Sequence, residues 1–163
     1  MCERFEDRAN FYLLKYRAAN GGAPLPITVY GDATGQARST SSKTDYDLIR
    51  EYFRGRGQFR LQFDYPRSNP RVKDRVNSVN AMLRNADGCV HTYVHPACKE
   101  LITDFHQVVW KRTSVNFELD KVTDKKRTHL SDALGYLVWQ VAPINPFHRE
   151  IITNQNRPYL TLP

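Results

Sequence analysis

Two acidic residues far apart in the chain, Asp132 and Asp32, have the positions that best fit a chemical role. Asp132 lies in the segment 127–140, RTHLSDALGYLVWQ, whose apolar residues recur at helical spacing. This apolar stripe consists of Leu130, Ala133, Leu134, Leu137 and Val138. His129 and Gly135 flank Asp132 on its own side of the predicted helix, three residues away in each direction. Glycine costs a helix roughly 1 kcal/mol relative to alanine, and a close approach of another backbone or a ligand is one reason to accept it. A solvated acid favoured by the helix dipole is the alternative.

Asp32 directly follows a short β-rich run, residues 27–30, and precedes the loop Ala33-Thr34-Gly35. An acid at the C-terminal end of a strand lies where open α/β sheets bind their ligands. A turn-forming aspartate is the alternative. Two such acids suggest a cation site for phosphate chemistry, because hard divalent ions bind carboxylate oxygens. A pair of metals about 3.5–4 Å apart can hold both the attacking and the leaving oxygen of a phosphodiester.

Four segments in order carry a family resemblance. They are VYGDATGQARSTSSKTDYDLIRE (29–51), SNPRVKDRVNSVNAML (68–83), VHPACKELITDFHQVVW (94–110) and KKRTHLSDALGYLVW (125–139). Over most of its length the chain resembles the C-terminal nuclease domain of the large terminase subunit of tailed bacteriophages. The resemblance implies an α/β fold of the ribonuclease-H-like nuclease type, a mixed sheet flanked by helices, that cuts concatemeric double-stranded viral DNA during packaging.

The resemblance also implies the site. Asp32 and Asp132 match the second and third metal-binding acids of the family, so both are expected to be catalytic and to hold a pair of Mg²⁺ or Mn²⁺ ions. Family members begin this domain with a strand that carries the first acid, followed by two further strands. The residues before 27 contain no such strand-end aspartate. We therefore expect a fold truncated at its N-terminus, with 1–142 as a partial terminase nuclease domain and 143–163 as a C-terminal tail.

If the first strand is absent, the strand 27–30 should present an unpaired edge, which invites association with another chain. We then expect the isolated chain to cleave DNA poorly. Two other interpretations stay open. One is a non-catalytic DNA- or capsid-binding remnant of a truncated terminase, and the other is a resolvase-like nuclease of the same fold.

Basic residues favour a nucleic-acid partner. The formal net charge is +7 and the isoelectric point about 9.5, which suits a polyanion. Phosphate contacts that do not read sequence are expected from the cluster before the Asp132 helix and from a Gly/Ser/Thr-rich loop. The candidate DNA-binding residues are Arg38, Lys43, Lys125, Lys126 and Arg127, with Ser39 beside them. His129 is a possible accessory residue at the site. A solvated basic surface without a partner is the alternative.

Composition narrows the class of protein. The 163 residues fit one domain, and 40% hydrophobic with 25% charged residues is ordinary for a globular protein. No apolar run approaches the ~20 residues of a membrane span, and we expect neither a signal peptide nor a membrane partner. No G-x-x-x-x-G-K-[ST] motif occurs, so ATP hydrolysis would belong elsewhere. By resemblance, the partners are the terminase ATPase region or small subunit and the portal or procapsid, in the cytoplasm of the bacterial host.

The cysteines give weak signals. Cys2, Cys89 and Cys98 are an odd number, and no disulfide is expected. Cys89 and Cys98 with His91 and His95 include zinc-ligand types, but their spacing does not match the usual finger patterns, so a zinc site is disfavoured.

Periodicity and turn signals predict the elements that position the acids. Helices are expected at 2–19, at 44–53 after a capping box, at 71–85, from 96 onward and at 127–140. Strands are expected at 27–30, 59–63 and 90–94, with a hairpin at 110–120. In the 71–85 helix, the expected apolar stripe is Val72, Val76, Val79 and Leu83, and the expected charged side is Arg71, Lys73, Arg75 and Arg84.

Overall fold

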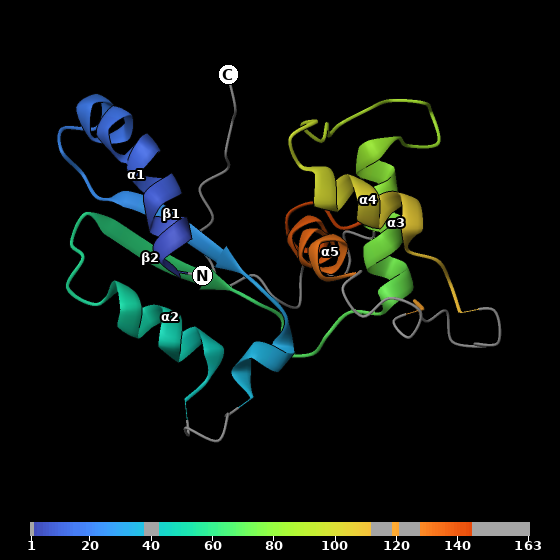
Figure 1. Ribbon diagram of the computed structural model, residues 1–163, viewed down its shortest axis with the longest axis horizontal. Coiled ribbons are helices and arrows are strands. Elements are labelled where there is room, and N and C mark those ends of the chain that lie inside the picture. Colours follow the sequence, from blue (N-terminus) through green and yellow to red (C-terminus); the bar gives the residue numbers. More distant parts are fainter. Residues whose placement is uncertain (1, 38–42, 112–118, 121–127, 145–163) are drawn as a thin grey trace. The chain divides into compact units, whose positions relative to one another are not determined.

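The computed structural model describes residues 2–37, 43–111, 119–120 and 128–144, and these form an α/β structure (Figure 1). The chain divides into two compact units, Met1–Asn69 and Pro70–Pro163. In order, its elements are α1 Cys2–Ala19, β1 Leu25–Tyr30, the short 3₁₀ helix η1 Ala33–Gln36, α2 Asp45–Phe53, β2 Phe59–Asp64, α3 Val72–Leu83, α4 Lys99–Gln107 and α5 His129–Val141.

The first unit is a two-stranded parallel sheet with helices packed on it. β1 pairs with β2 in parallel, from Leu25 opposite Phe59 to Tyr30 opposite Asp64. Parallel neighbours need a crossover connection, and α2 lies in that connection. The apolar core draws on both helices and both strands. It consists of Ala9, Leu13, Ile27, Phe53 and Phe59.

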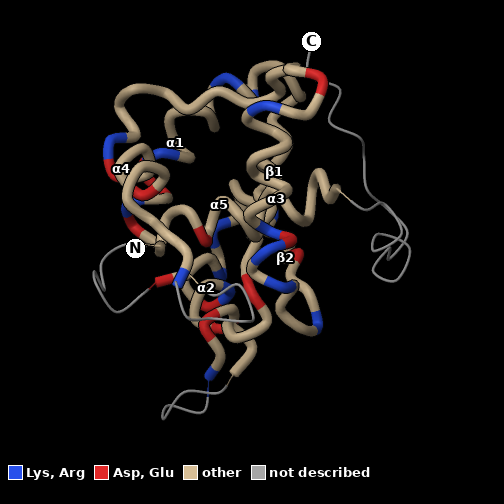
Figure 2. The backbone as a smooth tube through the Cα atoms, turned by 90° about the vertical axis from the view of Figure 1, so that its right-hand side faces the viewer, with Lys and Arg blue, Asp and Glu red and all other residues tan. Residues whose placement is uncertain are grey.

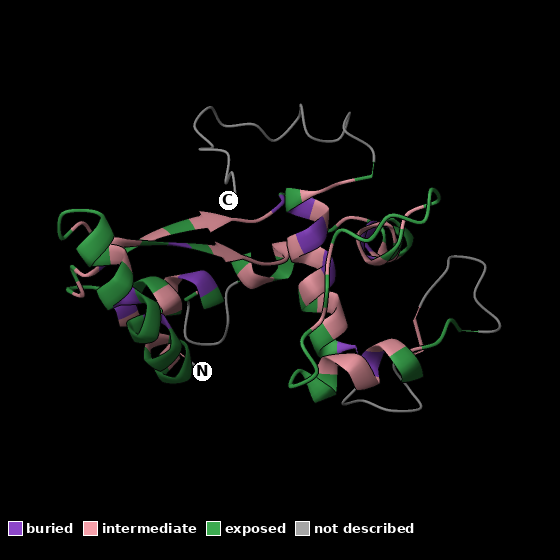
Figure 3. Cartoon of the chain, turned by 90° about the horizontal axis from the view of Figure 1, so that it is seen from above, coloured by how far each residue is buried: buried purple, intermediate pink, exposed green. Residues whose placement is uncertain are grey.

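Local sequence explains how the helices of this unit begin and end. Gly21 and Gly22 have positive φ values of 59° and 80°, a conformation that glycine adopts without strain and that ends α1. At the start of α2, the Thr44 hydroxyl accepts the Asp47 N–H at 3.1 Å, and the Asp47 carboxylate accepts the Thr44 N–H at 3.2 Å. This capping box was predicted from the sequence and is confirmed. Figure 3 shows that much of α1, next to the N label, is exposed.

The second unit is helical within the described residues. α5 packs against both α3 and α4. Thr128, the residue before α5, has a left-handed φ of 82° and no side-chain capping bond. Instead the Asp104 carboxylate on α4 accepts the Ser131 N–H at 3.2 Å. Asp104 is 2% exposed and satisfies one of the free N–H groups at the start of α5.

Two element predictions differ from the structure. Residues 90–94, expected as a strand, are irregular. Their backbone follows the end of α3 instead, because the His91 N–H donates to the Met82 carbonyl at 2.9 Å. The helix expected from Pro96 begins at Lys99. Of the hairpin expected at 110–120, the structure shows one antiparallel bridge between Trp110 and Leu119, and 112–118 lie outside the described residues.

The packed faces of α3 and α5 also differ from expectation. Arg75, placed on the charged side of its helix, is 5% exposed and is buried beside Val79. In α5, Leu130 is 48% exposed, whereas Gly135 and Val138 are buried. The side of α5 that carries Gly135 and Asp132 therefore faces inward, toward α3. Residues 145–163, most of the expected tail, lie outside the described residues.

Candidate acidic site

Asp32 shapes the loop that follows β1. Its Oδ1 accepts the Gly35 N–H at 2.9 Å and the Thr34 hydroxyl at 2.7 Å, which makes it the N-cap of η1. The next residue is held from further along the chain, since the Ala33 N–H donates to the Asn69 side-chain oxygen at 2.7 Å. Asp32 therefore has the turn-forming role given above as the alternative, and it still lies at the C-terminal end of a parallel strand.

Tyr46 on α2 supports the same loop. Its hydroxyl donates to the Asp32 main-chain carbonyl at 2.6 Å, and its residue is 5% exposed. A Cβ on Gly31 would overlap the Tyr46 hydroxyl, and one on Gly35 would lie 2.9 Å from the ring. The two glycines thus make room for the tyrosine. Sequence reasoning missed Tyr46, although the pair of glycines flanking Asp32 was a signal that something approaches there.

Asp132, in the first turn of α5, is paired with Arg75 on α3. Arg75 Nη1 lies 3.1 Å from Asp132 Oδ1, and the two side chains are 6% and 20% exposed. The guanidinium carbon lies 4.0 Å from the centre of the Tyr136 ring, one turn further along α5. A cation over an aromatic face is attracted to it, and the effect grows as water is excluded. Sequence reasoning missed both of these neighbours of Asp132.

A cavity of about 240 Å³ lies among α3, α4 and α5. Its polar lining includes the carboxylates Asp104 and Asp132 together with Arg75, Asn80 and Ser131, and Gly135 is at its wall. The apolar lining consists of Val76, Val79, Phe105, Val108, Trp110 and Leu119. Apolar walls with a few converging polar groups are typical of ligand sites.

The other candidate residues are distributed as follows. Lys43 is exposed and pairs with Glu51 at 2.6 Å. His129 is exposed at the first position of α5. The remaining candidates lie outside the described residues, namely Arg38, Ser39, Lys125, Lys126 and Arg127.

The two acids belong to different units, Asp32 to the first and Asp132 to the second, so their expected proximity stays a prediction. Within the described residues, no three His, Cys, Asp or Glu side chains gather as a metal-binding group. Cys89, His91, His95 and Cys98 are exposed.

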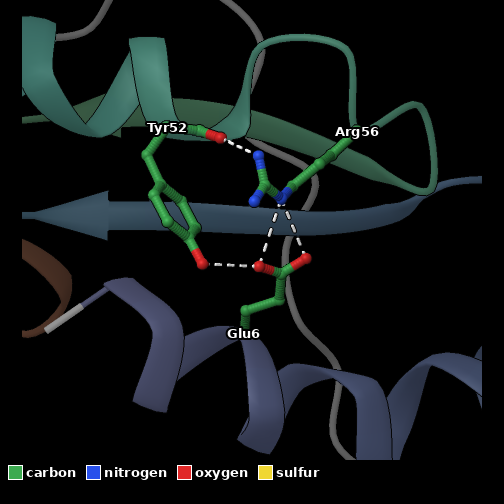
Figure 4. Close-up of polar contacts among 3 residues, drawn as sticks. All are labelled: Glu6, Tyr52 and Arg56. Carbon is green, nitrogen blue, oxygen red and sulfur yellow. Dashed lines mark hydrogen bonds and ion pairs between the residues drawn. The ribbon is translucent and has the colours of Figure 1, made fainter.

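The first unit also contains a charged cluster of Glu6, Tyr52 and Arg56 (Figure 4). The Tyr52 hydroxyl donates to Glu6 Oε2 at 2.7 Å, and Arg56 Nε donates to Glu6 Oε1 at 2.9 Å. Arg56 also donates to the Tyr52 main-chain carbonyl and lies over the Tyr52 ring. The Tyr52 hydrogen bond, with Arg56 second among the favourable contacts, holds the pKa of Glu6 below its ordinary value of 4.5. The cluster ties α1 to α2.

Comparisons with known proteins leave the family open: no family model, curated protein or solved structure matches the chain. In the described part of the chain, none of the helices has the length and apolar character needed to cross a membrane.

Proposed function

We propose that this chain is the metal-dependent endonuclease part of a phage DNA-packaging terminase, which cuts concatemeric double-stranded viral DNA. The observation that carries the proposal is the position of Asp32, at the C-terminal end of a strand in a parallel sheet and in a loop built around two glycines and Tyr46. That is where an open α/β sheet places a reacting group. Asp132, beside a cavity, supplies the second carboxylate.

The donor chemistry fits Mg²⁺ or Mn²⁺. Magnesium is commonly held by one or two carboxylates, with water and substrate phosphates completing its shell. Asp32 and Asp132 offer oxygen ligands of this kind, and His129 stands three residues before Asp132. When bound, the ions would activate a water and stabilise the charge that develops on the phosphate. The residues of the chain would orient the ions and the DNA backbone.

The order of elements supports a ribonuclease-H-like fold as the finer form of the observed α/β structure. α1, β1, α2 and β2 follow one another, with the two strands parallel. This is the arrangement expected of the part of the family fold that follows its first three strands. A net charge of +7 suits DNA as the partner. Basic and acidic residues are interspersed along the described chain, as Figure 2 shows.

In this proposal the protein works in the cytoplasm of the bacterial host, beside the terminase ATPase region or small subunit and the portal. A second candidate is a non-catalytic DNA- or capsid-binding remnant. The observation favouring it is that each acid already serves local structure, Asp32 as a cap and Asp132 as the partner of Arg75. A resolvase-like nuclease would use the same residues on a different DNA substrate.

The deciding experiment is cleavage of supercoiled plasmid by the purified chain with Mn²⁺ or Mg²⁺. We expect weak, metal-dependent nicking, because two acids hold a metal pair less well than three, and we expect it to be lost in both Asp32→Asn and Asp132→Asn. Asp7→Asn makes the same change at an exposed position of α1 and should leave nicking intact. If nicking survives in both site variants, a contaminating nuclease is its source. No nicking by any chain, together with retained DNA binding, would favour the non-catalytic remnant.

A further inference from the structure

We propose that Arg75 is a positioning residue for Asp132. It serves as a resident positive charge that sets the direction of the carboxylate and limits how tightly the site takes a divalent cation. The inference rests on the proposed function, because it concerns the metal that Asp132 would hold. Asp132, the acid expected to bind a metal, is already paired with the buried guanidinium of Arg75, 3.1 Å away.

The ion pair between Arg75 and Asp132 is made through one nitrogen of the guanidinium. Arg75 reaches Asp132 through Nη1, and the buried Arg75 Nε has no hydrogen-bond partner among the described residues. The strong form of an Arg–carboxylate pair is bidentate, with two parallel N–H···O bonds. A pair made through one nitrogen orients the carboxylate but binds it less firmly than a bidentate pair would.

The Arg75 guanidinium has a second contact, which does not involve Asp132. Its carbon lies 4.0 Å from the centre of the Tyr136 ring. Arg75 is buried where α3 packs against α5. Its stem and the Tyr136 ring would therefore keep the positive charge in place when Asp132 turns toward a metal. The metal would then bind beside a fixed like charge.

A fixed positive charge near a cation site weakens cation binding. Two unit charges a few ångströms apart in a partly buried setting interact by amounts that change binding constants by an order of magnitude or more. Arg75 is therefore expected to keep Mn²⁺ affinity low until a DNA phosphate adds negative charge to the site. A merely structural Arg75 would affect the stability of the fold but not the intrinsic metal affinity of the folded chain.

The test is calorimetric titration of Mn²⁺ into the full chain without DNA. We expect Arg75→Gln to bind Mn²⁺ about tenfold more tightly than the wild type, which corresponds to about 1.4 kcal/mol. Arg75→Lys keeps the charge and should stay close to wild type. Arg84→Gln removes the same charge from an exposed position at the end of the same helix and should change little. Asp132→Asn should weaken binding in every background.

A second measurement uses the wild type, because loss of a buried arginine can prevent folding. The Nε–H resonance of Arg75, assigned from its absence in Arg75→Lys, should shift on addition of Mg²⁺ and should not shift in Asp132→Asn. Equal Mn²⁺ affinity in wild type and Arg75→Gln, or an unmoved resonance when the wild type binds metal, would overturn this inference and leave the nuclease proposal standing. No metal binding by any chain would overturn both.

Discussion

Both candidate acids already have partners within their own units. The Asp32 carboxylate accepts a backbone N–H and a hydroxyl from its loop, and Asp132 accepts a hydrogen bond from a buried guanidinium. A partly buried carboxylate without partners would be costly, so these hydrogen bonds offset the cost of burial and orient each group. Replacing either acid should therefore lower stability as well as function, which is why the cleavage experiment needs folded, isosteric variants.

Stability in acid should depend on Glu6. Its pKa lies below 4.5 because of the Tyr52 hydrogen bond and Arg56, so the carboxylate stabilises the fold above pH 4.5 and that contribution is lost as pH falls through the lowered value. We expect the melting temperature of Glu6→Gln to lie below that of wild type near neutral pH and to approach it in acid. The measurement is thermal unfolding followed by circular dichroism from about pH 3 to pH 8.

The matched control for that profile is Asp7→Asn, which removes an exposed carboxylate from the same helix. Tyr52 determines where the contribution of this cluster to stability is lost at alkaline pH. Its pKa is raised above 10.0, first by the hydrogen bond to Glu6, so the contribution of the protonated phenol is lost only as pH rises through that raised value. If the difference in melting temperature between wild type and Glu6→Gln stays constant throughout the acid range, the role assigned to Glu6 is contradicted.

The positions of the two acids were predictable from sequence, but their partners were not. A carboxylate within an apolar helix, or directly after a β-rich run, is a local pattern that is visible along the chain. The partners are tertiary: Arg75 is 57 residues from Asp132, and Tyr46 is 14 residues from Asp32. Arg75 lies three residues after Val72 and four before Val79, at the border of its apolar stripe. Periodicity alone does not decide whether such a residue is buried.

At the level of elements, α5 offers a direct test of why it contains a glycine. A Cβ on Gly135 would meet Arg75 Cβ at 3.5 Å, which is ordinary van der Waals contact. Alanine should therefore fit, and we expect Gly135→Ala to stabilise the chain by about 0.4–1 kcal/mol through helix propensity. Urea denaturation measures the change. Gly21→Ala is the contrasting variant and should destabilise, because Gly21 has a φ of +59°.

Destabilisation by Gly135→Ala would instead mean that the added methyl group displaces Arg75 or that another backbone must approach this point. That approach was one reason suggested by the sequence for a glycine in this helix. The structure itself gives no backbone approach to Gly135 closer than ordinary contact within the described residues.

Helices whose ends are marked by capping or glycine residues were predicted well. Segments whose conformation depends on tertiary hydrogen bonds were not. α1 and α2 have clear end signals, and the capping box of α2 was identified from Thr44 and Asp47. The strand expected at 90–94 was wrong because β-forming residues need a neighbouring strand, and here the backbone bonds to the end of α3. The inward side of α5 was misjudged because its apolar residues cover more than one face.

For the whole molecule, charge gives the broadest prediction. A chain with a net charge of +7 should bind unrelated DNA sequences with strong salt dependence. Replacing Lys125, Lys126 and Arg127 with alanine should lower the slope of log affinity against log salt by about 0.9 for each DNA phosphate that these residues neutralise. Fluorescence anisotropy at several salt concentrations measures the slope. These three residues lie outside the described part of the structure, so the prediction rests on the sequence.

The control for charge alone is a triple alanine variant of Arg4, Arg8 and Lys15, three exposed basic residues of α1. It removes the same number of charges from another part of the chain. Equal slopes for the two variants would show that net charge, rather than the cluster before α5, governs DNA binding.

The division into two units was not visible from whole-chain properties. Length and composition describe averages over the chain, and by those averages it resembles one ordinary domain. The structure instead separates Met1–Asn69 from Pro70–Pro163, with one acid in each. The boundary falls in a short segment rich in proline and polar residues, SNPR at 68–71.

The two-stranded sheet leaves β1 with a second side that no strand occupies among the described residues. The Leu25 N–H donates toward β2, to the Gln58 carbonyl. Since alternate residues of a strand point the same way, Pro26, Thr28 and Tyr30 direct their backbone groups to the other side. Proline has no N–H to give, so an incoming strand would find donors only at Thr28 and Tyr30. That uneven set of donors would fix the alignment of any strand added here, because a shift along β1 would set one of its carbonyls against the proline ring.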